Sequence, residues 1–203
     1  MTSSIQLDPQ TVLAGYAAGL FPMADGRHGP LGWYECDPRA VLPLDERFHV
    51  SRSLVRQVRR GRFRVTRDEA FEPVIRACAR PELPDEEVWL TEPIIAAFVE
   101  LHRLELAHSV EAWEPGEAGP ELVGGVYGLA MGGAFFAESM FSRATDASKV
   151  CLVHLVEHLR EKGFSLLDAQ VPSPHLEQFG MIETGRSAYH AQLRDALEQP
   201  VRW

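Results

Sequence analysis

Three side chains that can hold or move a proton stand within largely apolar segments in the second half of the chain. Asp168 and Gln170 are two residues apart after the run 164–167, so on a strand they share one face. Glu138 stands among phenylalanine and methionine residues, where an acid is rarely simple surface. The three fit either a site that orients a reacting group or a satisfied polar network that joins strands. We favour the site, because all three fall on adjacent predicted strands.

Two weaker motifs indicate other chemistry. The string His154-Leu155-Val156-Glu157-His158 matches the H-x-x-E-H pattern of some zinc proteases, but no third ligand follows it, and no metal is predicted. The string Gly125-Val126-Tyr127-Gly128-Leu129-Ala130 matches half of the pyrophosphate loop of acetyl-CoA-dependent N-acetyltransferases. No helix follows it directly to offer its N-terminus to a phosphate, and no cofactor is predicted. Acetyl transfer from coenzyme A remains the alternative activity.

The charge distribution is uneven. The net charge of −9 taken alone argues against nucleic acid as a partner. Eight arginines and no acid lie between residues 47 and 67, whereas the remaining 12 basic and 29 acidic residues give a net charge of −17. A helix over 51–60 places four arginines on one face: Arg52, Arg56, Arg59 and Arg60. The guanidinium fork suits phosphate, so this face predicts one localised anionic partner. The alternative is a solvated helix face that acids from elsewhere neutralise.

Composition sets the broad class. The chain has 203 residues, of which 45% are hydrophobic and 24% are charged, as in a soluble globular protein with one substantial core and a small second lobe. Apolar runs end well before about 18 residues, so no membrane helix is expected. The first residues lack the pattern of a secretory signal. Three widely spaced cysteines favour a reducing, cytoplasmic location.

The elements that position the candidate residues follow from hydrophobic periodicity. Helices are predicted over 9–18, 51–60, 68–79, 91–104 and 187–197, and over a range capped by Asp146 or Ser148 and ended at Gly163. Strands are predicted over 62–66, 108–113 and 164–171, with two more in 122–141 joined at Gly132-Gly133. Segment 21–37 is predicted to be irregular. The strand, helix, strand order of 134–171 predicts a parallel crossover. The fold class is therefore α+β, or mixed α/β, with a helix-covered sheet.

Strings along nearly the whole chain resemble, in order, the bacterial leucyl/phenylalanyl-tRNA–protein transferases. Among them are Gly19-Leu20-Phe21-Pro22, Asp37-Pro38-Arg39-Ala40-Val41, Glu138-Ser139-Met140-Phe141-Ser142-Arg143, Asp146-Ala147-Ser148-Lys149 and Asp168-Ala169-Gln170-Val171. The resemblance implies an N-acetyltransferase-like catalytic domain over 39–203 behind a small N-terminal lobe over 1–38. It also implies transfer of leucine or phenylalanine, with methionine a further candidate, from aminoacyl-tRNA to acceptor proteins that begin with Arg or Lys. The products are marked for N-terminus-dependent degradation.

The resemblance also implies residue roles. Gln170 engages the attacking amine, Asp168 orients Gln170, and Glu138 binds or polarises the substrates. An apolar aminoacyl pocket corresponds to Phe135, Met140 and Leu167, and the terminal adenosine to Trp89. Met23 stands where longer relatives have a tryptophan on the other side of the adenosine. The helix 51–60 would hold the tRNA acceptor stem through its four arginines.

Other expectations concern assembly and one departure from the family pattern. We expect a monomer without membrane contact. Ala169 replaces a cysteine between Asp168 and Gln170, and a middle residue on a strand is expected to point away from the site. Besides the coenzyme-A alternative, a noncatalytic tRNA-binding module remains open.

Overall fold

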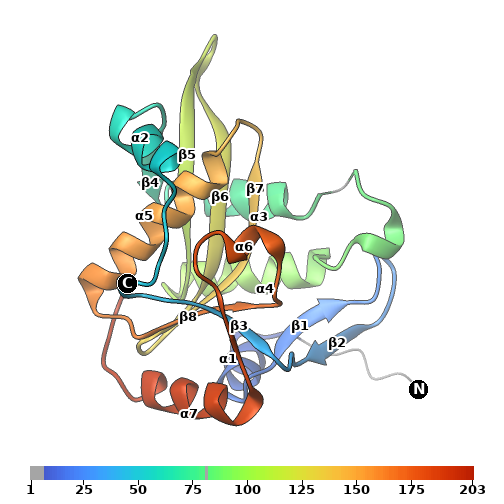
Figure 1. Ribbon diagram of the computed structural model, residues 1–203. Helices are drawn as coiled ribbons and strands as arrows, with labels where there is room; N and C mark the ends of the chain where they lie inside the picture. The colour runs from blue at the N-terminus through green and yellow to red at the C-terminus, as the bar shows by residue number, and fades with distance from the viewer. Residues whose placement is uncertain (1–6, 81) are drawn as a thin grey trace.

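A seven-stranded sheet with helices on both faces forms the body of the protein in the computed structural model, which describes residues 7–80 and 82–203 (Figure 1). The strands, in sheet order, are β4 (Arg64–Arg67), β5 (Ala107–Gly116), β6 (Gly119–Met131), β7 (Ala134–Ser142), β8 (Leu166–Gln170), β3 (Arg39–Leu42) and β9 (Ile182–Thr184). All neighbours are antiparallel except β7 and β8. The predicted α+β class with a helix-covered sheet is confirmed.

The helices divide between the two faces of the sheet. One face carries α1 (Pro9–Ala17), α3 (Phe71–Cys78), α4 (Glu92–Arg103) and α7 (Arg186–Leu197). The other carries α5 (Ala147–Lys162), together with α2 (Arg52–Arg60) and α6 (Pro174–Glu177). The apolar stripe that predicts the fourth helix is buried as expected, since Ile94, Ile95, Phe98 and Leu101 all lie inside. None of the helices in the described ranges is long and apolar enough to cross a bilayer.

The crossover from β7 through α5 to β8 confirms the predicted parallel connection. Only three residue pairs join the two strands, the last being Phe136 with Asp168, and beyond that pair the strands separate. On its other side β7 is irregular, because the register with β6 passes from Tyr127↔Ser139 to Gly128↔Ala137. Glu138 is the extra residue of this β-bulge, a device that re-aims a side chain. The sheet therefore opens next to Glu138.

The segment 21–37, predicted to be irregular, instead contains a hairpin of β1 (Phe21–Ala24) and β2 (Leu31–Tyr34). Its glycines and prolines hid the pattern, but Pro22 is tolerated because a two-stranded sheet has only edge strands. Phe21 and Ala24 are buried, so the hairpin is held by packing against the body. Val12, Tyr16 and Phe21 share one hydrophobic core with α3, α4 and α7. The lobe boundary at residue 38 stays a prediction.

Three short elements escaped the sequence analysis, namely β3, β9 and α6. Each has three or four residues, too few for a period to show. Between α3 and α4 lies a single turn of 3₁₀ helix, η1 (Asp85–Glu87). Segment 114–120 mostly continues the ladder between β5 and β6, whose tip projects above the molecule (Figure 1).

Candidate active site

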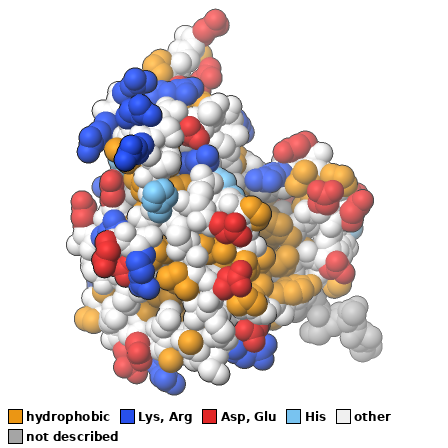
Figure 2. Space-filling model, viewed as in Figure 1, with side chains coloured by type: hydrophobic (Ala, Val, Ile, Leu, Met, Phe, Trp, Pro, Cys, Tyr) orange, Lys and Arg blue, Asp and Glu red, His pale blue; other side chains and the backbone are white. Residues whose placement is uncertain are grey.

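A cavity of about 470 Å³ occupies the opening between β7 and β8. It passes through the sheet, because its walls include residues from both hydrophobic cores. Apolar residues dominate, among them Phe21, Met23, Leu42, Trp89, Val126, Met140, Leu152 and Leu176. Figure 2 shows hydrophobic side chains in a hollow beside α6 and above the N-terminal hairpin. Six polar or charged side chains also line it: Arg80, Glu138, Ser139, Gln170, Ser173 and His175.

Gln170 and Glu138 form the polar centre of the cavity. The amide Nε2 of Gln170 donates a hydrogen bond to Glu138 Oε1 at 2.6 Å. This contact fixes which end of the amide faces the acid and leaves the amide oxygen of Gln170 directed to other donors. The pair joins the two strands where their backbones have parted. A ligand amine placed in the cavity would find two oxygen acceptors side by side.

The backbone at Gln170 takes an unusual conformation. Its φ of 59° lies in the left-handed region, which non-glycine residues seldom adopt. Asp168 Oδ1 accepts a hydrogen bond from the Gln170 backbone N–H at 2.8 Å, closing a turn of the kind that aspartate side chains favour. The strand therefore ends in a turn that re-aims Gln170, and Asp168 holds that turn. Such local strain recurs at functional sites.

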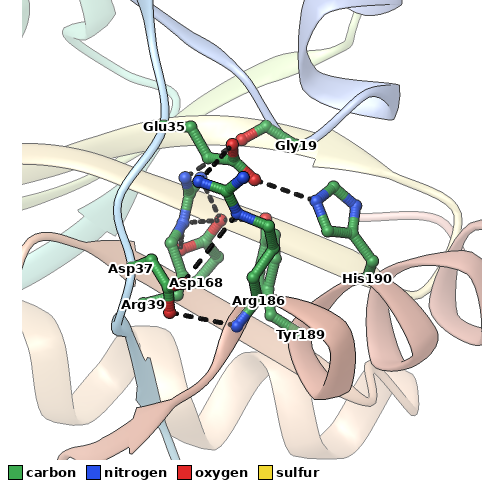
Figure 3. Close-up of polar contacts among 8 residues, drawn as sticks. All are labelled: Gly19, Glu35, Asp37, Arg39, Asp168, Arg186, Tyr189 and His190. Carbon is green, nitrogen blue, oxygen red and sulfur yellow. Dashed lines mark hydrogen bonds and ion pairs between the residues drawn. The ribbon is translucent and has the colours of Figure 1, made fainter.

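The carboxylate of Asp168 is held in place by hydrogen bonds from Arg39 and Tyr189 (Figure 3). Arg39 binds it with two nitrogens, Nε to Oδ1 at 2.9 Å and Nη2 to Oδ2 at 2.7 Å, and Tyr189 donates its hydroxyl to Oδ2 at 2.6 Å. The side chains of Arg39 and Asp168 are both 0% exposed. Because every lone-pair direction of Asp168 serves Arg39, Tyr189 or the Gln170 backbone, Asp168 positions Gln170 and does not reach a ligand.

Arg39 and Tyr189 are functional-site residues that the sequence analysis did not single out. The guanidinium of Arg39 also donates to the carbonyl of Gly19 at 3.0 Å and lies between the rings of Phe21 and Tyr189. A signal was present, because Arg39 begins the apolar string Arg-Ala-Val-Leu, and a buried arginine requires an acid. The string was too short to identify as a strand.

A second group of charged residues lies beside the cluster of Asp168, Arg39 and Tyr189 (Figure 3). Glu35 accepts Arg186 Nη2 at 3.1 Å and His190 Nε2 at 3.0 Å, and Asp37 accepts the backbone N–H of Arg186 at 3.1 Å. These contacts tie the segment after the N-terminal hairpin to the start of α7. Arg186 is 57% exposed, so the pairs are worth little individually and fix geometry more than stability.

The carboxyl of Glu138 is electrostatically unusual. Part of the residue remains exposed, yet withdrawal of its carboxyl from water raises the pKa to about 8, and the neighbouring Asp168 carboxylate adds to the increase. The hydroxyl of Tyr16 lies nearby, though it makes no hydrogen bond of normal geometry within the described residues. A carboxyl with a pKa near neutral can both give and take a proton at physiological pH.

The raised pKa of Glu138 predicts an effect on stability. Between the unfolded pKa near 4.5 and the folded pKa near 8, the folded state keeps a proton that the unfolded state has lost. The free energy of unfolding of the wild type therefore falls as pH rises through this window. Glu138→Gln does not titrate, so relative to wild type it should gain stability, on the order of 5 kcal/mol, by pH about 9. Urea unfolding of both proteins across this range checks it, and a pH-independent difference would contradict the assignment.

The structure brings several of the predicted residues to the cavity. Trp89 and Met23 line one side, and Met140 lines the other. The backbone N–H of Ala24 donates to the carbonyl of Trp89 at 3.1 Å, which joins the hairpin to the segment that carries Trp89. Phe135 and Leu167 lie in the hydrophobic core beside the cavity, 1% and 0% exposed, and are not among its lining residues.

Ala169 departs from its prediction. The expectation that it points away from the site was wrong, because Ala169 lines the cavity. It packs with the core on the α5 face of the sheet, as strand alternation requires. The cavity passes through the sheet between β7 and β8, however, so residues on both faces border it. A larger side chain at 169 would therefore narrow the apolar side of the cavity.

The arginine helix is confirmed as α2. Ser51 caps it by accepting the Leu54 backbone N–H at 3.3 Å, and Gly61 ends it in the left-handed region. Arg52, Arg56, Arg59 and Arg60 are exposed and form no ion pair with any described residue, and Figure 2 shows basic side chains gathered over this region. Neutralisation by acids from elsewhere, the alternative interpretation, is therefore not what the structure shows for these four. Gln57 Nε2 donates to Asp146 Oδ2 at 3.0 Å, which ties α2 to the start of α5.

The histidines of the H-x-x-E-H string lie on α5 without converging. His154 approaches Glu157 at 3.5 Å, whereas His158 packs edge-on against Trp203. Across the residues that the structure describes, no cluster of three or more His, Cys, Asp or Glu side chains could hold a metal ion.

Comparison with known proteins gives a consistent result. The profile of the family described as leucyl/phenylalanyl-tRNA protein transferase matches residues 41–194, and that of its N-terminal domain matches residues 5–37. The leucyl/phenylalanyl-tRNA–protein transferase of Chlorobaculum parvum is 52% identical over 192 residues, which cover 95% of this chain and 96% of that protein. The protein of the same name from Rubrobacter xylanophilus is 55% identical over 193 residues, with the same coverage of both chains.

Among solved structures, FemX shares the fold, with a TM-score of 0.56, 11% sequence identity, and coverage of 87% of this chain and 66% of FemX. The two curated relatives share about half of their residues with this chain over almost its full length. This similarity shows membership of one family, and not only a common fold. The chain belongs to the leucyl/phenylalanyl-tRNA–protein transferase family.

Proposed function

We propose that this protein transfers leucine or phenylalanine from aminoacyl-tRNA to the N-terminal Arg or Lys of acceptor proteins, as a monomer in the cytoplasm. The observation that carries the proposal is the Gln170–Glu138 pair at the centre of an apolar cavity. The names of the relatives supply the donor. The new N-terminal residue would mark the acceptor for degradation.

The reaction requires attack by the acceptor's α-amine on the ester carbonyl that joins the amino acid to the terminal ribose. A C–N bond forms, the C–O bond to the ribose breaks, the amine loses a proton and the ribose oxygen gains one. The amide oxygen of Gln170 accepts a hydrogen bond from the amine and orients its lone pair. Glu138, with a pKa of about 8, matches an α-amine of pKa about 8 and takes the proton.

Substrate positioning accounts for much of the rate, since the ester is already activated. The apolar side of the cavity, with Met140 in its wall and Phe135 and Leu167 behind it, would take the leucine or phenylalanine side chain. Such a pocket separates side chains by only about 1–3 kcal/mol per methylene, so methionine is also expected as a donor. Trp89 and Met23 would hold the adenosine between them, where stacking contributes roughly 1–3 kcal/mol.

The experiment is transfer of labelled leucine from Leu-tRNA to peptides that differ only at the first residue. Peptides that begin with Arg or Lys should become labelled, whereas the same peptides with an acetylated N-terminus should not. Labelled acetyl-CoA offered to the same peptides tests the coenzyme-A alternative. Binding of Leu-tRNA without transfer to any peptide would instead indicate a noncatalytic tRNA-binding module.

The arginines of α2 predict a salt-dependent interaction with the tRNA acceptor stem. Arg52→Gln/Arg56→Gln should weaken Leu-tRNA binding and reduce the slope of log K against log salt by roughly one for each phosphate that the variant no longer binds. Filter binding over a salt series measures both quantities. Arg47→Gln/Arg64→Gln is a charge-matched control, because Asp45 and Glu69 already pair with those arginines. Equal slopes in wild type and the α2 variant would contradict the interaction.

A further inference from the structure

A second cavity, of about 720 Å³, adjoins the first. Arg80 lines both cavities, so the two meet at its side chain. The second cavity lies between the end of α3 and the end of β7, and three of its lining residues are arginines: Arg76, Arg80 and Arg143. None of the steps described above uses this cavity.

Two of these three arginines have no acidic partner among the described residues. Arg76 is engaged by Glu72 and Glu92. Arg80 and Arg143 are exposed, and neither pairs with an acid in the described part of the chain. Arg143 lies 5.2 Å above the Phe141 ring and donates from Nη1 to the carbonyl of Leu122 at 3.2 Å, contacts that hold its guanidinium at the rim. Among the described residues that line this cavity, Glu82 is the only acid.

We propose that Arg80 and Arg143 bind the phosphates of the unpaired nucleotides that precede the terminal adenosine of the tRNA. This inference rests on the proposed function. If the first cavity holds the adenosine and its amino acid, the polynucleotide must leave past its rim. At Arg80 that rim opens into the second cavity, which we call the groove. Two of its arginines, Arg80 and Arg143, have no acidic partner among the described residues. Proteins bind single strands by following the backbone with such basic grooves.

The sign of the charge distinguishes this strand from the other substrate. The acceptor protein begins with an ammonium group and a cationic side chain, which Arg80 and Arg143 would repel. A phosphodiester chain is attracted by the same pair, and guanidinium groups bind phosphate oxygens with two parallel hydrogen bonds. The second cavity therefore suits the donor strand.

Three leucyl donors of decreasing length distinguish the contribution of this groove from that of α2. Leu-tRNA contains the acceptor stem, a leucyl-CCA trinucleotide contains only the unpaired phosphates, and leucyl-adenosine contains no phosphate. Arg143→Gln, at a residue that lines only the second cavity, should reduce kcat/KM several-fold for Leu-tRNA and for leucyl-CCA, and leave leucyl-adenosine unchanged. The α2 variant Arg52→Gln/Arg56→Gln should affect Leu-tRNA alone. Arg103→Gln/Arg194→Gln, which removes two exposed arginines from α4 and α7, controls for net charge.

The proposed groove also predicts a change in salt dependence. The slope of log KM against log salt for leucyl-CCA should fall by about 0.7 for each phosphate that is no longer bound, the value for single strands. Equal reductions on leucyl-CCA and leucyl-adenosine, or no reduction on leucyl-CCA, would overturn the inference. Unchanged turnover of leucyl-adenosine excludes misfolding of the variant. If wild type transfers leucine from none of the three donors, it is the proposed function that fails.

Discussion

Gln170→Ala should lower kcat for leucine transfer by about 10²–10³-fold and leave the affinity for Leu-tRNA close to that of wild type. The amide nitrogen of Gln170 donates to Glu138, and in the proposed reaction the amide oxygen would accept from the amine. Both functions act on the reacting groups and not on the polynucleotide. Single-turnover transfer at saturating Leu-tRNA measures the first quantity, and filter binding measures the second.

The backbone of Gln170 needs its own control, because φ is 59° and alanine is strained there as glutamine is. Gln170→Gly removes the same amide but relieves the strain, which stabilises such positions by about 1 kcal/mol. The glycine variant should be as inactive as the alanine variant and at least as stable. Recovery of activity in Gln170→Gly would show that backbone geometry, and not the amide, limits the reaction.

Arg39→Met should destabilise the fold by about 3–5 kcal/mol, the effect expected when one partner of a buried ion pair is removed. Asp168 would keep Tyr189 and the Gln170 backbone as partners but would lose its counter-charge in a site without water contact. For a chain of this size each kcal/mol lowers Tm by about 2–4 °C. Urea unfolding and thermal denaturation at neutral pH both measure the destabilisation.

Two further variants separate the charge of Arg39 from its shape. Arg39→Lys keeps the charge without the two-nitrogen contact and should be intermediate in stability. Arg39→Met/Asp168→Asn removes both charges and should recover part of the stability that Arg39→Met lacks. A destabilisation of less than about 1 kcal/mol in Arg39→Met would mean that Asp168 does not depend on this pair.

Much of the site was predictable because its residues lie on, or are positioned by, helices and strands that are long enough to show a period. The parallel crossover through α5 has clear periodicity, and it brings Glu138 on β7 close to Gln170 on β8. The arginine face of α2 was equally predictable from the sequence, since a helix with one charged face needs only local sequence to form. These features depend on periods of 2 and 3.6 residues that extend over whole elements.

The features that the sequence did not reveal are set by single residues and tertiary contacts. The β-bulge at Glu138 shifts the register by one residue, which no periodicity records. Arg39 belongs to a four-residue strand whose partner, β8, lies far along the chain. Ala169 borders the cavity only because β7 and β8 separate after Asp168, so alternation along one strand could not reveal it.

The most direct test offers both acyl donors to the enzyme at once. A peptide that begins with Arg is incubated with the protein, Leu-tRNA and acetyl-CoA, and the product mass is measured. We expect a peptide extended by one leucine residue at its N-terminus, formed by wild type and almost absent with Gln170→Ala. A peptide that gains an acetyl group and no leucine would contradict this expectation.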